Sequence, residues 1–145
     1  MRLILFRLIG ILEVGGGLYG MASMLHRLLP PGPFHTALPA LIAFALYAFV
    51  LVAGVLLLEG SDRGVHLSSI AQLLQLPLIA TPILSYGLYC GGFINVFATL
   101  HLPPHLALDW HFVSEGFVLA LAGPAVSRLG INLLALLSWL ALRLR

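Results

Sequence analysis

Residues 37–58, ALPALIAFALYAFVLVAGVLLL, form 22 consecutive positions without a charged side chain. A helix that crosses a bilayer needs about 20 predominantly apolar residues, so this stretch predicts a membrane-spanning helix. The rest of the chain has the same character, because 61% of its 145 residues are hydrophobic and only 8% are charged. A soluble domain has about 25% charged residues. We therefore expect a single membrane domain over residues 1–145.

Three further stretches predict additional spans, over residues 3–25, 64–100 and 129–142. Arg7 and Glu13 interrupt the apolar run of the first stretch, so we interpret it as a retained span rather than a signal peptide. Short connections leave no room for a separate soluble domain. The sequence thus predicts an all-α fold: a polytopic integral membrane protein with four transmembrane helices in a four-helix bundle.

The third stretch is too long for one straight span. Its 37 residues would extend about 55 Å as a helix, whereas the hydrocarbon core of a bilayer is about 30 Å thick. Pro77 and Pro82 are the positions where a helix is expected to bend. We therefore expect a long, proline-kinked third helix over residues 64–88 with an extension to residue 100, followed by an outer segment over residues 101–128.

The arginines predict the orientation of the chain, because cytoplasmic loops of membrane proteins carry an excess of basic residues. The chain has no lysine, which is typical of a GC-rich genome, and we expect a bacterial inner membrane protein. With both termini inside, five arginines lie on the cytoplasmic side and two lie outside. The inner group is Arg2, Arg7, Arg63, Arg143 and Arg145, and the outer group is Arg27 and Arg128.

Polar side chains recur near the predicted middle of each span, where their burial in lipid is costly. We expect them to form one layer at a common depth. This intramembrane polar cluster comprises Glu13, Tyr47, Gln72, Gln75 and Asn132. Hydrogen bonds between helices would account for such a layer, and so would a site that carries a proton or an ion, or a ligand-binding pocket.

Small residues share the helix face of Glu13 in the first span. Such residues let a second helix approach closely, so this face is expected to pack against another span. We infer that the first and third spans face each other, with Glu13 within reach of Gln72 or Gln75. The glycines assigned to helix packing are Gly10, Gly16, Gly17 and Gly20.

Several histidines lie on the predicted outer side, where imidazoles can bind metals. The candidates are His26, His101, His105 and His111, but their spacing is not specific, because two prolines separate His101 from His105. The single cysteine excludes an internal disulfide and a cysteine-based metal site. We therefore expect no metal and no cofactor.

No catalytic or phosphate-binding motif is present, so the sequence favours a small, non-enzymatic membrane protein that acts as an oligomer or as an accessory subunit of a membrane complex. The expected partners are the lipid bilayer, a second copy or other membrane subunits. The net charge of +2, without a basic run, predicts no nucleic-acid partner. One alternative is a small channel or a proton- or ion-coupled transporter that uses the layer around Glu13. A second is a membrane enzyme or redox protein that uses the outer histidines.

Overall fold

The computed structural model describes residues 2–29, 32–91, 93–99, 106–111, 116–120 and 127–144. It contains a β-sheet as well as helices, so the predicted all-α fold is wrong. The four helices are α1 (Arg2–Leu28), α2 (Phe34–Leu58), α3 (Asp62–Gln75) and α4 (Leu133–Arg143).

Among the described residues, six strands lie between α3 and α4 in the sequence and form one antiparallel sheet. Their order across the sheet is β4-β3-β6-β1-β2-β5. The strands are β1 (Pro77–Ala80), β2 (Ser85–Tyr89), β3 (Phe93–Thr99), β4 (Leu106–His111), β5 (Gly116–Ala120) and β6 (Arg128–Asn132).

The stretch predicted as a kinked third helix is helical only at its start. The helix α3 ends at Gln75, and Pro77 begins β1 two residues later. Proline has no backbone N–H to donate to the preceding turn, so it is not expected to continue a helix. Residues 77–99 are rich in isoleucine, valine, tyrosine, phenylalanine and threonine, which favour strands. The prediction that this stretch is not one straight helix is confirmed, whereas the kinked helix over residues 64–88 is wrong.

The predicted last span, residues 129–142, is also wrong. Its first part is β6, and the following helix α4 has only 11 residues, which is about 16 Å and too short to cross a bilayer. The helix begins where it does because the side chain of Asn132 accepts hydrogen bonds from the backbone nitrogens of Leu134 and Ala135, which caps the helix N-terminus. Within the predicted outer segment, residues 106–111 and 116–120 form strands.

Two helices are long and apolar enough to cross a membrane. The segments that qualify are Leu3–Leu28 in α1 and Ala37–Leu58 in α2, and they agree closely with the predicted spans over residues 3–25 and 37–58. Among the residues that the structure describes, no other helix qualifies. The four-transmembrane-helix bundle is therefore replaced by a hairpin of two long helices joined to a mixed layer of sheet and short helices.

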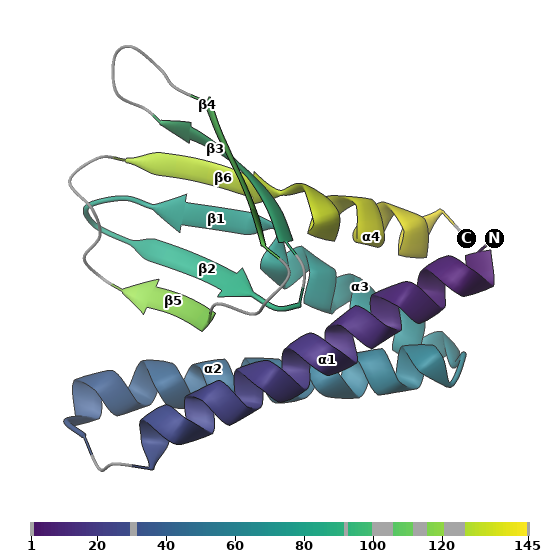
Figure 1. Cartoon of the computed structure of the whole chain (residues 1–145), viewed down its shortest axis with the longest axis horizontal. Coiled ribbons are helices and arrows are strands. Elements are labelled where there is room, and N and C mark those ends of the chain that lie inside the picture. The colour runs from purple at the N-terminus through teal and green to yellow at the C-terminus, as the bar shows by residue number, and fades with distance from the viewer. Residues whose placement is uncertain are drawn as a thin grey trace.

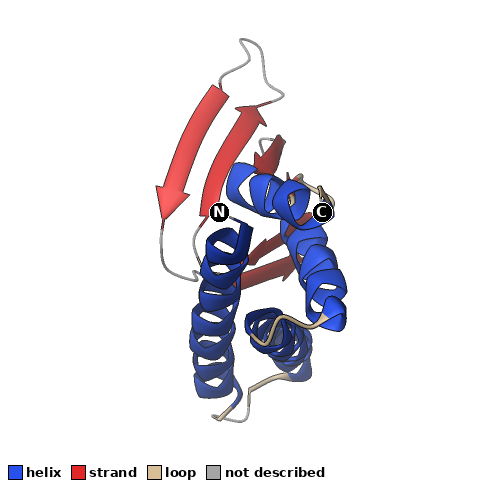
Figure 2. Ribbon diagram, turned by 90° about the vertical axis from the view of Figure 1, so that its right-hand side faces the viewer, coloured by secondary structure: helices blue, strands red, loops and turns tan. Residues whose placement is uncertain are grey.

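The hairpin of α1 and α2 forms one layer of the molecule, and the remaining elements form the other. Figure 1 shows the sheet above the half of the hairpin that contains its turn, and α3 with α4 above the other half. Figure 2 shows the same arrangement from the end at which the two chain termini lie close together. The interior between these layers contains the polar groups of the candidate site.

Candidate functional site

Glu13 lies where α1, α2 and α3 meet, and its side chain is only 2% exposed. The amide nitrogen of Gln72 donates a hydrogen bond of 2.8 Å to Oε1 of Glu13. The hydroxyl of Ser68 donates one of 2.7 Å to Oε2 and also lies 3.3 Å from the carbonyl oxygen of Ala53. Both carboxyl oxygens are thus hydrogen-bonded, and the expected contact between Glu13 and the predicted third stretch is present through Gln72.

The sequence of α3 brings these groups to Glu13. Ser68, Gln72 and Gln75 are spaced by four and three residues, so they lie on one face of the helix. Their helix approaches closely because glycines line the contact: a Cβ at Gly64 would overlap the backbone of α2. On α2 itself, a Cβ at Gly54 would come within 2.8 Å of the Glu13 side chain. Small residues therefore create the space in which a carboxyl group is buried.

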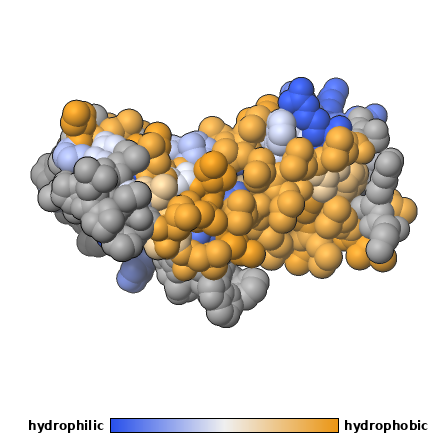
Figure 3. Space-filling view, turned by 90° about the horizontal axis from the view of Figure 1, so that it is seen from above, coloured by the Kyte–Doolittle hydropathy of each residue, from blue (hydrophilic) through white to orange (hydrophobic). Residues whose placement is uncertain are grey.

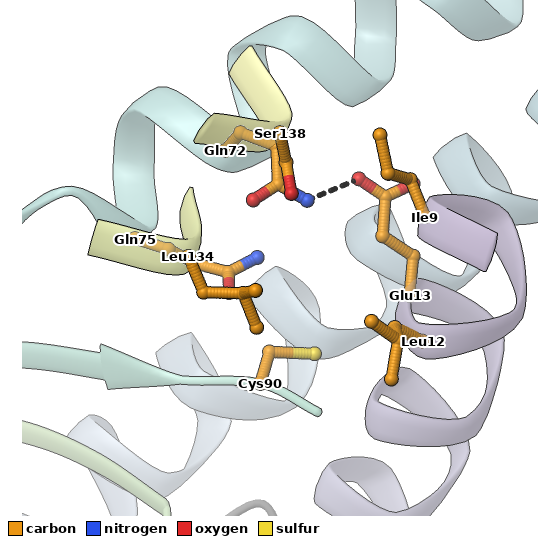
Figure 4. A pocket seen from close by; sticks show the side chains of 8 residues that line it. All are labelled: Ile9, Leu12, Glu13, Gln72, Gln75, Cys90, Leu134 and Ser138. Carbon is orange, nitrogen blue, oxygen red and sulfur yellow. Dashed lines mark hydrogen bonds between the residues drawn. The ribbon is translucent and has the colours of Figure 1, made fainter. Parts of the chain in front are cut away.

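A small cavity adjoins this cluster. It offers about 10 Å³ to the centre of a water-sized sphere, which is room for about one water molecule. Figure 4 shows Gln75 across the cavity from Glu13, and Cys90 below it. The side chain of Gln75 is 3% exposed and makes no hydrogen bond with the residues that the structure describes. The lining residues are Ile9, Leu12, Glu13, Gln72, Gln75, Cys90, Leu134 and Ser138.

The other two members of the predicted polar layer lie elsewhere. Tyr47 is fully buried in α2, and its hydroxyl donates a hydrogen bond of 2.8 Å to the carbonyl oxygen of Tyr89. Asn132 lies at the junction of β6 and α4, where it caps the helix, not in the middle of a span. The predicted single layer is therefore divided into three separate hydrogen-bonding sites, and only Glu13, Gln72 and Gln75 are together.

The glycines assigned to helix packing lie at close contacts in two directions. Gly10, Gly17 and Gly20 face α2, whereas Gly16 faces the turn at Gly91 between β2 and β3. A Cβ at Gly17 would come within 2.9 Å of Leu51 in α2. The glycine-rich face of α1 thus holds both the hairpin and the sheet layer close to the helix backbone.

Of the four histidine candidates, the structure describes the side chain of His26. His26 is exposed near the end of α1, while His101, His105 and the side chain of His111 lie outside the described part of the chain. Within that part, no group of three histidine, cysteine, aspartate or glutamate side chains could hold a metal ion.

Cys90 is 5% exposed beside the cavity. Burial, with a smaller contribution from the nearby Glu13 carboxylate, raises the pKa of its thiol from 9.0 to about 12. Because the thiolate is the reactive form, this cysteine is expected to be inert at neutral pH.

Two members of this cluster were not predicted as site residues. Ser68 lies four residues before Gln72 on the same helix face, so the spacing within α3 could have identified it. Ser138 lies on α4, and its position beside the cavity depends on how the sheet returns the chain to the hairpin. No pattern in the neighbouring sequence predicts that Ser138 lies beside the cavity.

Comparisons with protein-family models, with curated proteins and with solved structures find no match. The function must therefore be argued from the geometry of the chain itself.

Proposed function

We propose that this chain is a non-enzymatic membrane protein, held in the bilayer by the α1–α2 hairpin, that acts as an oligomer or as an accessory subunit of a membrane complex. The observation that carries the proposal is the distribution of polar and apolar side chains on the hairpin. Glu13 and Tyr47 are buried inside the protein, whereas large apolar side chains point outward. The outward set includes Ile4, Leu8, Ile11, Leu18, Leu25, Leu38, Leu41, Val52 and Val55.

Such a surface suits lipid rather than water. Soluble monomers rarely expose contiguous apolar patches larger than a few hundred square ångströms. Figure 3, which views the molecule from above Figure 1, shows hydrophobic atoms over most of the coloured surface and the largest group of hydrophilic atoms near one end. At 1.5 Å per residue, the segments of 26 and 22 residues in the two helices are long enough to cross a bilayer.

The position of the sheet supports an assembly rather than a lone monomer. Because the sheet lies beside one half of the hairpin (Figure 1), a hairpin that spans the bilayer places the sheet at the depth of the lipid chains. Open sheet edges do not face lipid, because their backbone groups would lack hydrogen-bond partners. The described part of β4 pairs only with β3. This edge therefore calls for a covering protein surface, from a second copy or another subunit.

One face of strands β4, β3 and β6 supports the same proposal. Two rows of apolar residues cross it, as the strand register shows. Leu108, Val96 and Ile131 form one row, and Leu106, Ala98 and Leu129 form the other. We call these six residues the apolar sheet face; its four larger leucine and isoleucine side chains are 44–82% exposed.

The arginines support the orientation with both termini in the cytoplasm of a bacterial cell. Three arginines lie in the start of α1, the start of α3 and the end of α4, which are near the two chain termini: Arg7, Arg63 and Arg143. Arg27 and Arg128 belong to the end of α1 and the start of β6, which lie at the opposite end of the molecule (Figure 1). This distribution agrees with an excess of basic residues on the cytoplasmic side.

The experiment that tests the assembly is mass measurement of the chain after mild extraction from membranes. We expect a particle larger than the 15.6 kDa monomer, either a homo-oligomer or a complex with another membrane protein. Ile131→Asp in the apolar sheet face should reduce the particle to a monomer, while Arg128→Gln in the same strand should leave it intact. A monomer before any substitution would contradict the proposal.

A second candidate function is proton or cation transfer through the Glu13 cluster. The cavity beside Glu13 favours this function, and so does the side chain of Gln75, which lines the cavity and makes no hydrogen bond with the described residues. Flux measured in liposomes tests it: Glu13→Gln keeps the hydrogen-bonding capacity but removes the carboxyl group. Flux that is lost in Glu13→Gln supports transfer, and no flux from the unaltered chain excludes it.

A further inference from the structure

A groove between α3 and α4, separate from the Glu13 cluster, has the dimensions of a ligand site. Its volume is about 420 Å³, within the range typical of small-molecule sites. One wall consists of residues spaced along a single face of α3, from Asp62 to Leu73. The other wall is the last part of α4, where Arg143 and Trp139 lie one turn apart.

The two ends of the groove differ in chemistry. Because α3 begins and α4 ends near the chain termini (Figure 1), Asp62, His66 and Arg143 lie toward that end of the groove. The guanidinium of Arg143 lies 5.1 Å from the centre of the Trp139 ring, which orders it by a cation–π interaction. Ile70 and Leu73 line the opposite part of the groove, and both side chains are exposed. The groove thus has a charged end and an apolar end.

We infer that this groove binds the headgroup of a zwitterionic, amine-bearing phospholipid. The phosphate would lie against Arg143 and the imidazole of His66, and the ammonium against Asp62. The first acyl carbons would follow Ile70 and Leu73. Asp62 and Arg143 carry one negative and one positive charge, which complements a zwitterion better than a purely anionic headgroup. Arginine also matches the geometry of phosphate oxygens.

The depth of the groove agrees with this ligand, a point that rests on the membrane location proposed above. The charged end of the groove lies beside the start of α1 and the end of α2, where a spanning hairpin leaves the hydrocarbon core. Phospholipid headgroups occupy that level of a bilayer, and tryptophan is enriched there.

The test follows the emission of Trp139 in the detergent-solubilised full chain. Trp110→Phe leaves Trp139 as the sole tryptophan, since the chain contains two. The probe is dioctanoyl phosphatidylethanolamine below its micelle concentration. We expect a saturable change in emission, with a midpoint weakened about tenfold by Arg143→Gln because a charge-assisted hydrogen bond is lost. Arg63→Gln, an exposed arginine on α3 that does not line this groove, should leave the midpoint unchanged.

Two further titrations identify the ligand. Dioctanoyl phosphatidylglycerol should bind more weakly than the amine lipid, and Asp62→Asn should abolish that preference. Free phosphoethanolamine should also bind more weakly, because it lacks the chain that contacts Ile70 and Leu73. An unchanged midpoint in Arg143→Gln, or equal binding of the two lipids to the unaltered chain, would overturn the inference. Equal binding of the free headgroup would assign the groove to a soluble phosphoester instead.

The titration does not require that the hairpin spans a membrane, so its failure is distinguishable from failure of the proposed function. A chain that inserts into membranes but shows no lipid titration would reject the groove alone. A chain that binds the lipid in detergent but does not insert would reject the membrane anchor.

Discussion

Glu13 connects α1 to α3 through two hydrogen bonds, and its removal leaves the amide of Gln72 without its acceptor. The hydroxyl of Ser68 would keep only its longer contact with the carbonyl oxygen of Ala53. We expect Glu13→Ala to lower the free energy of unfolding by about 2 kcal/mol, because one buried hydrogen bond is lost and a second is weakened. Thermal unfolding in detergent, followed by circular dichroism, measures the effect. Glu59→Ala, at an exposed position after α2, is the control and should change little. Equal unfolding temperatures for the two variants would contradict a stabilising role for the cluster.

Cys90 provides a chemical test of the same interior. Since burial raises the pKa of its thiol to about 12, the folded chain should react slowly with iodoacetamide at pH 8 and rapidly once unfolded. Mass spectrometry of the alkylated chain measures this reaction. Rapid, complete labelling of the folded protein would show that Cys90 is accessible.

The raised pKa of Cys90 also predicts how the stability of the fold depends on pH. The unfolded thiol ionises above about pH 9 while the folded thiol remains protonated, so the free energy of unfolding should fall as pH rises from about 9 to 12.

The site residues differ in how far the sequence predicts them. The contact of Glu13 with Gln72 follows from two polar groups in otherwise apolar helices, since each needs a partner away from water. Asn132 shows the opposite case, because an asparagine in an apolar run also fits a helix N-cap. The hydrogen bonds of Asn132 to the start of α4 explain why the predicted mid-membrane position is wrong. The functional role of the cluster remains a prediction.

At the level of the helices, the close packing of α1 on α2 depends on particular glycines. Gly17→Ala should destabilise the hairpin by about 1–3 kcal/mol, because the added Cβ would come within 2.9 Å of Leu51 and within 3.0 Å of its backbone. Gly15→Ala is the matched control, since nothing lies within 4 Å of the Cβ that it adds. This second variant should be neutral or slightly stabilising, because alanine favours helix over glycine. Thermal unfolding of both variants in detergent measures the difference, and equal destabilisation would reject the close contact.

The two long helices could be predicted from the sequence and the sheet could not. Residues 3–25 and 37–58 are continuous apolar runs long enough to indicate helices by length alone. In residues 64–100, the high apolar content does not distinguish strands from helix, because a buried strand and a buried helix both lack an alternation of polar and apolar residues. The β-branched and aromatic residues after Pro77 were the available signal for strands. The pairing of β6 between β3 and β1 depends on contacts distant in sequence.

For the whole molecule, the two layers impose different requirements. The outward apolar residues of the hairpin suit lipid, whereas the open edge and apolar face of the sheet require a protein surface at the same depth. A hairpin lying flat at the membrane surface would remove that requirement, because the sheet would then face water. The transmembrane position of the hairpin is therefore the central claim of this account.

Labelling of single cysteines in intact cells or right-side-out vesicles tests this claim most directly. In a Cys90→Ala background, Gly32→Cys places a cysteine between α1 and α2, and Glu59→Cys places one at the exposed position after α2. A membrane-impermeant maleimide added from outside should label the cysteine at position 32 and leave the cysteine at position 59 unlabelled until the membrane is opened. Labelling of both positions from the same side would contradict a membrane-spanning hairpin.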